Sequence, residues 1–136
     1  MRYVLDADVL IGALDSSDAH HKQSRRLFVV WREQGDALLV SVVNLSEVLV
    51  APAASQQRLR AAREAIAALG VTVHLPTEAI GVDASRYRSR HPISLPDSYL
   101  LATAKHTGAT TVSFDGKVVR AATAEGIATN QRDAKR

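Results

Sequence analysis

Short apolar runs alternate along the chain with longer stretches of mixed polarity. The runs are Tyr3–Leu5, Ala37–Val40, Val71–Val73 and Thr111–Phe114, with a weaker one near Ile127. They are rich in β-branched or long apolar residues, and a short run of this kind is typical of a buried strand. The pattern therefore predicts four firm strands and a weak fifth.

The stretches between these runs have the spacing of helices. Residues 55–69 are the clearest case, because their apolar residues fall on one helical face. Ser55 is placed to cap this helix and Gly70 to end it. We expect the other helices over residues 19–34, over residues 76–90, from Pro96 to His106, and from about Asn44 onward.

Strands that alternate with crossovers of about 12 residues or more favour a parallel sheet. Right-handed crossovers then place helices on both faces of that sheet. The 136 residues predict a single α/β domain over residues 1–136. The polar residues 130–136 are expected to fray as a tail.

Composition narrows the possible functions. The chain has no cysteine, which excludes disulfides, cysteine-based zinc sites and a thiol nucleophile. No apolar run approaches the ~20 residues of a membrane span, and Asp6 comes too early for the apolar region of a signal peptide. We therefore expect a cytoplasmic protein without a membrane partner.

The net charge of +3 is compatible with a nucleic-acid partner but is weak evidence for one. The arginines gather on the predicted helices, where they would either face RNA or form solvated surfaces. They are Arg25, Arg26, Arg32, Arg58, Arg60, Arg63, Arg86, Arg88 and Arg90.

Acidic residues follow the predicted strands or begin the predicted helices. Asp6 and Asp115 come directly after two apolar runs, and Asp8 lies two residues beyond Asp6. Glu47 and Asp97 lie near the starts of two helices. The carboxyl ends of parallel strands and the N-termini of the following helices share one edge of the sheet, where such folds form their sites. We therefore expect these carboxylates to converge.

Convergence of like charges raises their pKa values unless a cation offsets them. Mg²⁺ and Mn²⁺ prefer oxygen ligands, so either ion would suit such a cluster. A carboxylate-held ion with open water positions is suited to phosphodiester hydrolysis. The sequence alone thus indicates a metal-dependent phosphodiesterase.

Each acid also has a structural interpretation. Asp6 or Asp8 could cap a helix, and Asn44-Leu-Ser-Glu47 and Ser94-Leu-Pro-Asp97 both match helix caps. Asp115-Gly116 is a hairpin turn signal. Four acids at one edge make a shared site a better explanation than four separate caps and turns.

The histidines and aromatic residues add no further site. No ligand spacing relates the histidines, and we expect surface or structural roles for His20, His21, His74, His91 and His106. The few aromatic residues do not interleave as a platform for stacked bases would require.

Four segments in this order and spacing resemble the PIN-domain ribonucleases, most closely the VapC-type toxins of type II toxin–antitoxin systems. The segments are Val4-Leu-Asp-Ala-Asp-Val-Leu-Ile11, Asn44-Leu-Ser-Glu-Val-Leu49, Leu95-Pro-Asp-Ser-Tyr-Leu-Leu-Ala-Thr-Ala104 and Thr111-Val-Ser-Phe-Asp115. The resemblance covers essentially the whole chain. It implies a three-layer α/β/α sandwich around a parallel sheet.

The same resemblance implies Mg²⁺- or Mn²⁺-dependent cleavage of structured RNA, commonly tRNA or ribosomal RNA. By matching position, the acidic roles in catalysis and metal binding would go to Asp6, Glu47, Asp97 and Asp115. Ser113 would be an auxiliary hydroxyl residue. Asp8 departs from the usual pattern, which has serine, threonine or asparagine there. The resemblance also implies a homodimer and a cognate VapB-type antitoxin that lies over the active-site groove.

Two other functions remain open at this point. The opening motif also resembles haloacid-dehalogenase-type phosphatases, with Asp6 as covalent nucleophile and Asp8 as general acid. The chain is short for that fold, and Glu47 and Asp97 would have no role. The other alternative is a non-catalytic RNA- or protein-binding module whose acids only cap helices. Stabilisation by Mg²⁺ or Mn²⁺ would argue against that module.

Overall fold

The computed structural model of the chain describes residues 1–130. Its four strands form one parallel sheet in the order β3-β2-β1-β4. Their bounds are Arg2–Leu5 for β1, Ala37–Ser41 for β2, Val71–His74 for β3 and Thr110–Val112 for β4. The predicted parallel sheet and its four firm strands are confirmed.

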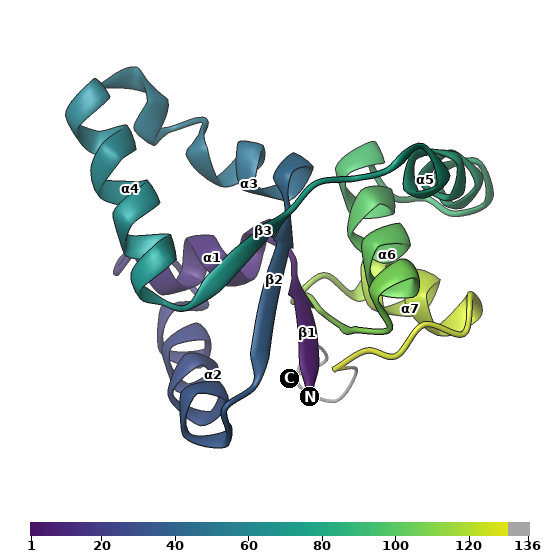
Figure 1. Cartoon of the computed structure of the whole chain (residues 1–136), viewed down its shortest axis with the longest axis horizontal. Helices are drawn as coiled ribbons and strands as arrows, with labels where there is room; N and C mark the ends of the chain where they lie inside the picture. The colour runs from purple at the N-terminus through teal and green to yellow at the C-terminus, as the bar shows by residue number, and fades with distance from the viewer. Residues whose placement is uncertain (131–136) are drawn as a thin grey trace.

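Seven α-helices and one short 3₁₀ helix surround the sheet within residues 1–130. They are α1 (Ala7–Leu14), α2 (His21–Gln34), α3 (Val42–Leu49), η1 (Pro52–Ala54), α4 (Gln56–Ala68), α5 (Glu78–Arg90), α6 (Leu95–Thr107) and α7 (Gly116–Ala124). In Figure 1, α1, α2 and α4 lie on one side of the sheet and α5, α6 and α7 on the other. The predicted three-layer α/β/α sandwich is confirmed.

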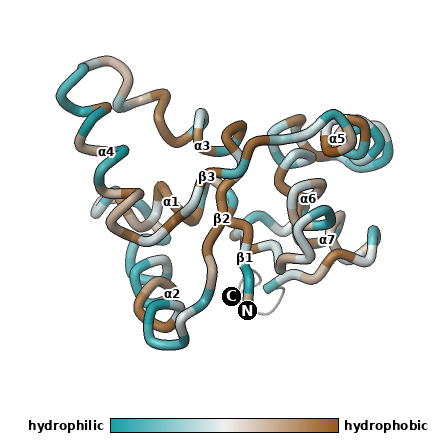
Figure 2. Tube along the Cα trace, in the orientation of Figure 1, coloured by the Kyte–Doolittle hydropathy of each residue, from teal (hydrophilic) through white to brown (hydrophobic). Residues whose placement is uncertain are grey.

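The central strand β1 shows why both faces must be covered. Successive side chains of a strand point to opposite faces. Val4 accordingly packs into the apolar core beneath α5, α6 and α7, and Leu5 into the core beneath α1, α2 and α4. Both side chains are fully buried. Figure 2 shows the same division, with apolar strands inside and polar positions on the outer sides of α4 and α5.

Helix caps place several helices where the sequence predicts them. The Ser55 hydroxyl accepts a hydrogen bond from Arg58 N at 3.1 Å at the start of α4. The φ angle of Gly70, which follows this helix, is +80°. This left-handed conformation favours glycine and ends the helix. Both predicted boundaries of the helix over residues 55–69 hold within a residue or two.

The predicted start of the third helix needs a correction. This helix begins at Val42 and not around Asn44, because the Ser41 hydroxyl caps it and accepts from Val43 N at 3.3 Å. Asn44 therefore lies inside the first turn and is fully buried. The Asn44-Leu-Ser-Glu47 capping box does not form.

The segment after β4 differs from two expectations, a hairpin turn at Asp115-Gly116 and a weak strand near Ile127. Asp115 is the N-cap of α7, so the hairpin interpretation of Asp115-Gly116 is wrong. Helix α7 buries Val118 and Val119 completely, which a tight turn could not do. The weak strand expected near Ile127 is reduced to a single parallel bridge between Thr111 and Thr129.

The predicted frayed tail falls outside the described residues, apart from Asn130. Asn130 N donates to Thr111 O at 3.1 Å, and its side-chain oxygen accepts from Ser113 N at 3.2 Å. Within residues 1–130, no helix combines the length and apolarity that crossing a membrane requires.

Candidate active site

Asp6 is held at the junction between β1 and α1. Its backbone N–H donates to Val112 O at 2.9 Å, which extends the pairing of β1 with β4 by one bond. One carboxylate oxygen accepts from Ala7 N and the other from the Ser113 hydroxyl, both at 2.7 Å. The residue is only 5% exposed. Burial, together with the charges of Asp8 and Asp97, raises the pKa of Asp6 well above its usual value.

Asp8 lies in the first turn of α1 and faces the loop after β4. Its Oδ2 accepts from Phe114 N at 3.0 Å. Its Oδ1 is buried without a hydrogen-bond partner among residues 1–130. Burial, with a smaller contribution from the charge of Asp115, raises the pKa of Asp8 to about 6, although the Phe114 hydrogen bond and the His20 charge act to lower it. Asp8 thus belongs with the other candidate acids. We call these residues the carboxylate cluster: Asp6, Asp8, Glu47, Asp97 and Asp115.

Ser113 links the acids of the first and last strands. Its fully buried hydroxyl donates to Asp6 Oδ2 and accepts from Asp115 N at 3.1 Å. Its backbone N–H is held by Asn130. A hydroxyl can donate and accept at once, so serine satisfies both neighbours in this position.

Asp115 begins the last helix of the cluster. Its Oδ1 accepts from Lys117 N at 2.9 Å, which is the usual N-cap bond. Its other carboxylate oxygen makes no hydrogen bond with residues 1–130. The structural and functional interpretations of this acid are therefore compatible.

Asp97 combines a helix cap with a place beside Glu47. It forms a capping box with Ser94: Asp97 Oδ2 accepts from Ser94 N, and Ser94 Oγ accepts from Asp97 N, both at 3.2 Å. The pKa of Glu47 is raised by burial first and then by the charge of Asp97. Asp97 also raises the pKa of Asp6, so its charge reaches both acids.

Repulsion between the acids raises the pKa values of three of them. Asp97 acts on Glu47 and on Asp6, Asp8 acts on Asp6, and Asp115 acts on Asp8. As the side chains lie here, no three acidic or histidine residues among residues 1–130 are grouped closely enough to hold a metal ion. The donor set nevertheless fits a hard divalent cation. It consists of carboxylates whose charges repel one another, and the unpartnered Oδ1 of Asp8 is an open acceptor.

Asn44 and His20 also lie at this site, although the sequence analysis assigns neither of them to it. Asn44 Nδ2 donates to Glu47 Oε1 at 3.3 Å and to Pro96 O at 3.1 Å, so it connects α3 to the start of α6. Its place three residues before Glu47 puts both on one helical face, a signal that was available. The ring of His20 stacks on Phe114, and no sequence pattern indicates that contact.

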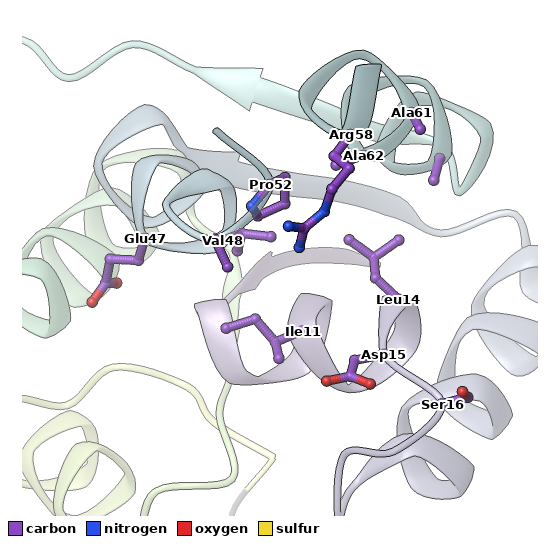
Figure 3. A pocket seen from close by; sticks show the side chains of 12 residues that line it. Ile11, Leu14, Asp15, Ser16, Glu47, Val48, Pro52, Arg58, Ala61 and Ala62 are labelled. Carbon is purple, nitrogen blue, oxygen red and sulfur yellow. The ribbon is translucent and has the colours of Figure 1, made fainter. Parts of the chain in front are cut away.

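A groove of about 600 Å³ opens beside Glu47, between α1, α3, η1 and α4. Figure 3 shows Glu47 at one end of it and Asp15 at the other. The apolar side chains of Ile11 and Val48 lie between them, and the Arg58 guanidinium points in from α4. This groove could receive an apolar segment beside the carboxylates.

Comparisons with known proteins agree with this architecture. A family model described as PIN domain matches residues 3–124. A search of curated proteins gives no match. Among solved structures, VapC20 of Mycobacterium tuberculosis, described as a sarcin-ricin loop cleaving toxin, is similar at a TM-score of 0.71 and 20% identity, over 92% of this chain and 95% of that one.

Two VapBC structures give similar results. The VapBC-1 structure from nontypeable Haemophilus influenzae matches at a TM-score of 0.71 and 20% identity, over 100% of both chains. A DNA-bound VapBC2 structure from Rickettsia felis matches at 0.67 and 13%, over 88% of this chain and 92% of that one. At these identities the likeness concerns the fold.

Proposed function

The chain belongs to the PIN-domain family, and on that premise we propose that it is a metal-dependent endoribonuclease toxin of the VapC type. The carrying observation is that Ser113 connects Asp6 to Asp115 through hydrogen bonds where β1 and β4 end, and that Asp8 is bonded to Phe114 beside them. Its substrate is structured cellular RNA, tRNA or ribosomal RNA. The similarity to a toxin that cleaves the sarcin-ricin loop supports this substrate class.

Asp6, Asp97 and Asp115 are the residues that would hold Mg²⁺ or Mn²⁺, with Glu47 beside them. When bound, such an ion supplies a Lewis acid that polarises phosphate oxygens and acidifies water. Ser113 fixes the orientation of Asp6 through its hydroxyl. Asp8 adds a further negative charge from α1 as an auxiliary acid.

Glu47 would orient or deprotonate the attacking water, or help to bind a second ion. Its raised pKa makes it a better base than an ordinary surface glutamate. As the base, it takes a proton from the attacking water as the water oxygen bonds to phosphorus. The bond from phosphorus to the 3′ oxygen breaks in line, and the departing 3′ oxyanion takes a proton from solvent water, which leaves a 5′-phosphate and a 3′-hydroxyl.

A cognate VapB-type antitoxin and a second copy of the chain complete the proposal. Similarity to VapBC complexes supports the antitoxin partner. The groove beside Glu47 offers an apolar floor on which an antitoxin segment could lie. Its occupation would keep RNA from the site.

The phosphatase alternative is disfavoured by the family match over residues 3–124. A phosphatase with Asp6 as covalent nucleophile and Asp8 as general acid would also leave Glu47 and Asp97 without a role. A non-catalytic module is disfavoured because the unpartnered oxygen of Asp8 would then only destabilise it.

The test is cleavage of total RNA by the purified chain in Mg²⁺, in Mn²⁺ and in chelator, with the new 5′ ends sequenced. We expect discrete cleavage sites with 5′-phosphates that disappear in chelator. Asp97→Asn should abolish cleavage with an unchanged circular dichroism spectrum. Glu64→Gln, which removes an exposed carboxylate on α4, should cleave like the wild type. Cleavage that persists in chelator, or at the wild-type rate in Asp97→Asn, would contradict the proposal.

A further inference from the structure

The imidazole of His20 lies at the rim of the carboxylate cluster. It stacks on the ring of Phe114, with 4.4 Å between ring centroids and 20° between ring planes. Phe114 directly precedes Asp115, and its N–H donates to Asp8. The charge of His20 also lowers the pKa of Asp8. A histidine from the start of α2 is thereby brought to acids on α1 and at the end of β4.

The two nitrogens of the His20 ring differ in their surroundings. His20 Nδ1 lies 3.8 Å from Asp18 Oδ2, and His20 N donates to the same oxygen at 2.9 Å. Within residues 1–130, nothing hydrogen-bonds His20 Nε2. The side chain is 45% exposed. The ring therefore contacts Phe114 and lies near Asp18, and its Nε2 is available for a further hydrogen bond.

A hydrogen-bond donor to phosphate is needed at this site because the negative charges of the acids repel RNA. Every nucleotide brings a phosphate, and contacts that offset phosphate charge supply much of the affinity for nucleic acids. An Nε2–H donor is present in the imidazolium and in one neutral tautomer of histidine. A ring stacked on Phe114 has fewer orientations to lose, so it can present this donor at a smaller entropic cost than a free lysine or arginine.

We propose that His20 is a substrate-binding residue whose Nε2–H donates a hydrogen bond to a phosphate oxygen of the RNA beside the carboxylate cluster. Phe114 is its positioning residue. The inference rests on the proposed function, because it takes RNA as the substrate of this site. It adds a specific phosphate contact on the side of the cluster that β4 and α2 form.

The experiment separates binding from chemistry. The dissociation constant for a fluorescently labelled RNA hairpin is measured by anisotropy in chelator, and kcat and KM are measured in Mn²⁺. His20→Ala should weaken binding and raise KM by about tenfold, the scale of one hydrogen bond to a charged group, with kcat nearly unchanged. His20→Lys should restore most of the affinity, because it returns a donor to the rim.

His21→Gln is the matched control. The adjacent His21 hydrogen-bonds Gly12 O at 2.8 Å through Nδ1, so its loss should alter stability and leave RNA affinity unchanged. Phe114→Leu removes the stack and should weaken binding less than His20→Ala does. In the His20→Ala background it should add nothing further.

The outcomes distinguish this inference from the proposed function. If His20→Ala binds RNA like the wild type, or weakens it no more than His21→Gln does, the inference is wrong whether or not the chain cleaves RNA. A fall in kcat alone would also overturn it, because it would place His20 in the chemical step. A wild type that binds the hairpin but never cleaves RNA contradicts the proposed function, and the binding data still decide the role of His20.

Discussion

Asp8→Asn should stabilise the metal-free protein at alkaline pH and have little effect at acid pH. Holding Asp8 ionised is costly, because burial raises its pKa to about 6 from an ordinary value of 3.8. At about 1.4 kcal/mol per pKa unit, this pKa difference lowers the free energy of unfolding by about 3 kcal/mol above pH 7. Asparagine keeps an acceptor for Phe114 N and removes the charge. Part of the gain will be lost with that charged hydrogen bond, so we expect a net gain of about 2 kcal/mol.

The sign of the pH dependence follows from proton binding. An acid whose pKa is higher in the folded than in the unfolded state binds more protons when folded between those two values. The free energy of unfolding of the wild type therefore falls as pH rises from about 4 to about 6 through this group. Asp6 acts in the same direction, because its pKa is also raised. His20 and Asp115 face Asp8 and modulate its ionisation.

The assay is urea unfolding in chelator at pH 4 and pH 8 for the wild type and Asp8→Asn. Asp15→Asn at the other end of α1 is the control with the opposite sign. Hydrogen bonds from Ser17 lower the pKa of Asp15, so its stabilising effect is present at pH 8 and is lost at acid pH. An equal effect of Asp8→Asn at both pH values, or destabilisation at pH 8, would refute the reasoning.

Three further predictions concern the cation, the link between helices and the packing of α1. Mg²⁺ at about 100 times its dissociation constant should raise the free energy of unfolding by about 2.7 kcal/mol, measured by urea unfolding against chelator; no shift would count against a cation site. Asn44→Ala should slow RNA cleavage in the wild type but much less in a Glu47→Gln background, because Asn44 holds Glu47; additive losses in a double-mutant cycle would contradict this link. Gly12→Ala should lower stability by about 1–3 kcal/mol in thermal unfolding, because an added Cβ would overlap the Ser24 hydroxyl where α1 crosses α2; wild-type stability would show that the two helices can separate without cost.

The sequence predicts the sheet and most helices because these depend on local patterns. Ser55 and Gly70 are adjacent signals that bound one helix, and the structure follows them. The start of α3 was misplaced because Ser41 and Asn44 are both good N-caps. Tertiary hydrogen bonds distinguish them: the Asn44 amide donates to Glu47 and to the Pro96 carbonyl, and the Ser41 hydroxyl caps the helix.

The candidate acids can be predicted because chain topology brings strand ends and helix starts to one edge. Which other side chains complete the site depends on tertiary packing that no spacing encodes. His20 and Phe114 are 94 positions apart in sequence, and their stack forms only because α2 begins beside the end of β4. Asn130 is similar, since it supports Ser113 from a segment predicted to be a tail.

Helix capping and catalysis are not competing explanations for these acids. Asp6, Asp97 and Asp115 each accept a hydrogen bond from an N–H at or beside the start of a helix. Each cap uses one carboxylate oxygen for that bond and fixes the side chain at the same edge of the sheet. The helix starts also carry partial positive charge, which lowers the cost of gathering several carboxylates there. The caps thus make a cluster of mutually repelling acids tolerable before any cation binds, and the unpartnered oxygen of Asp8 marks where this compensation is incomplete.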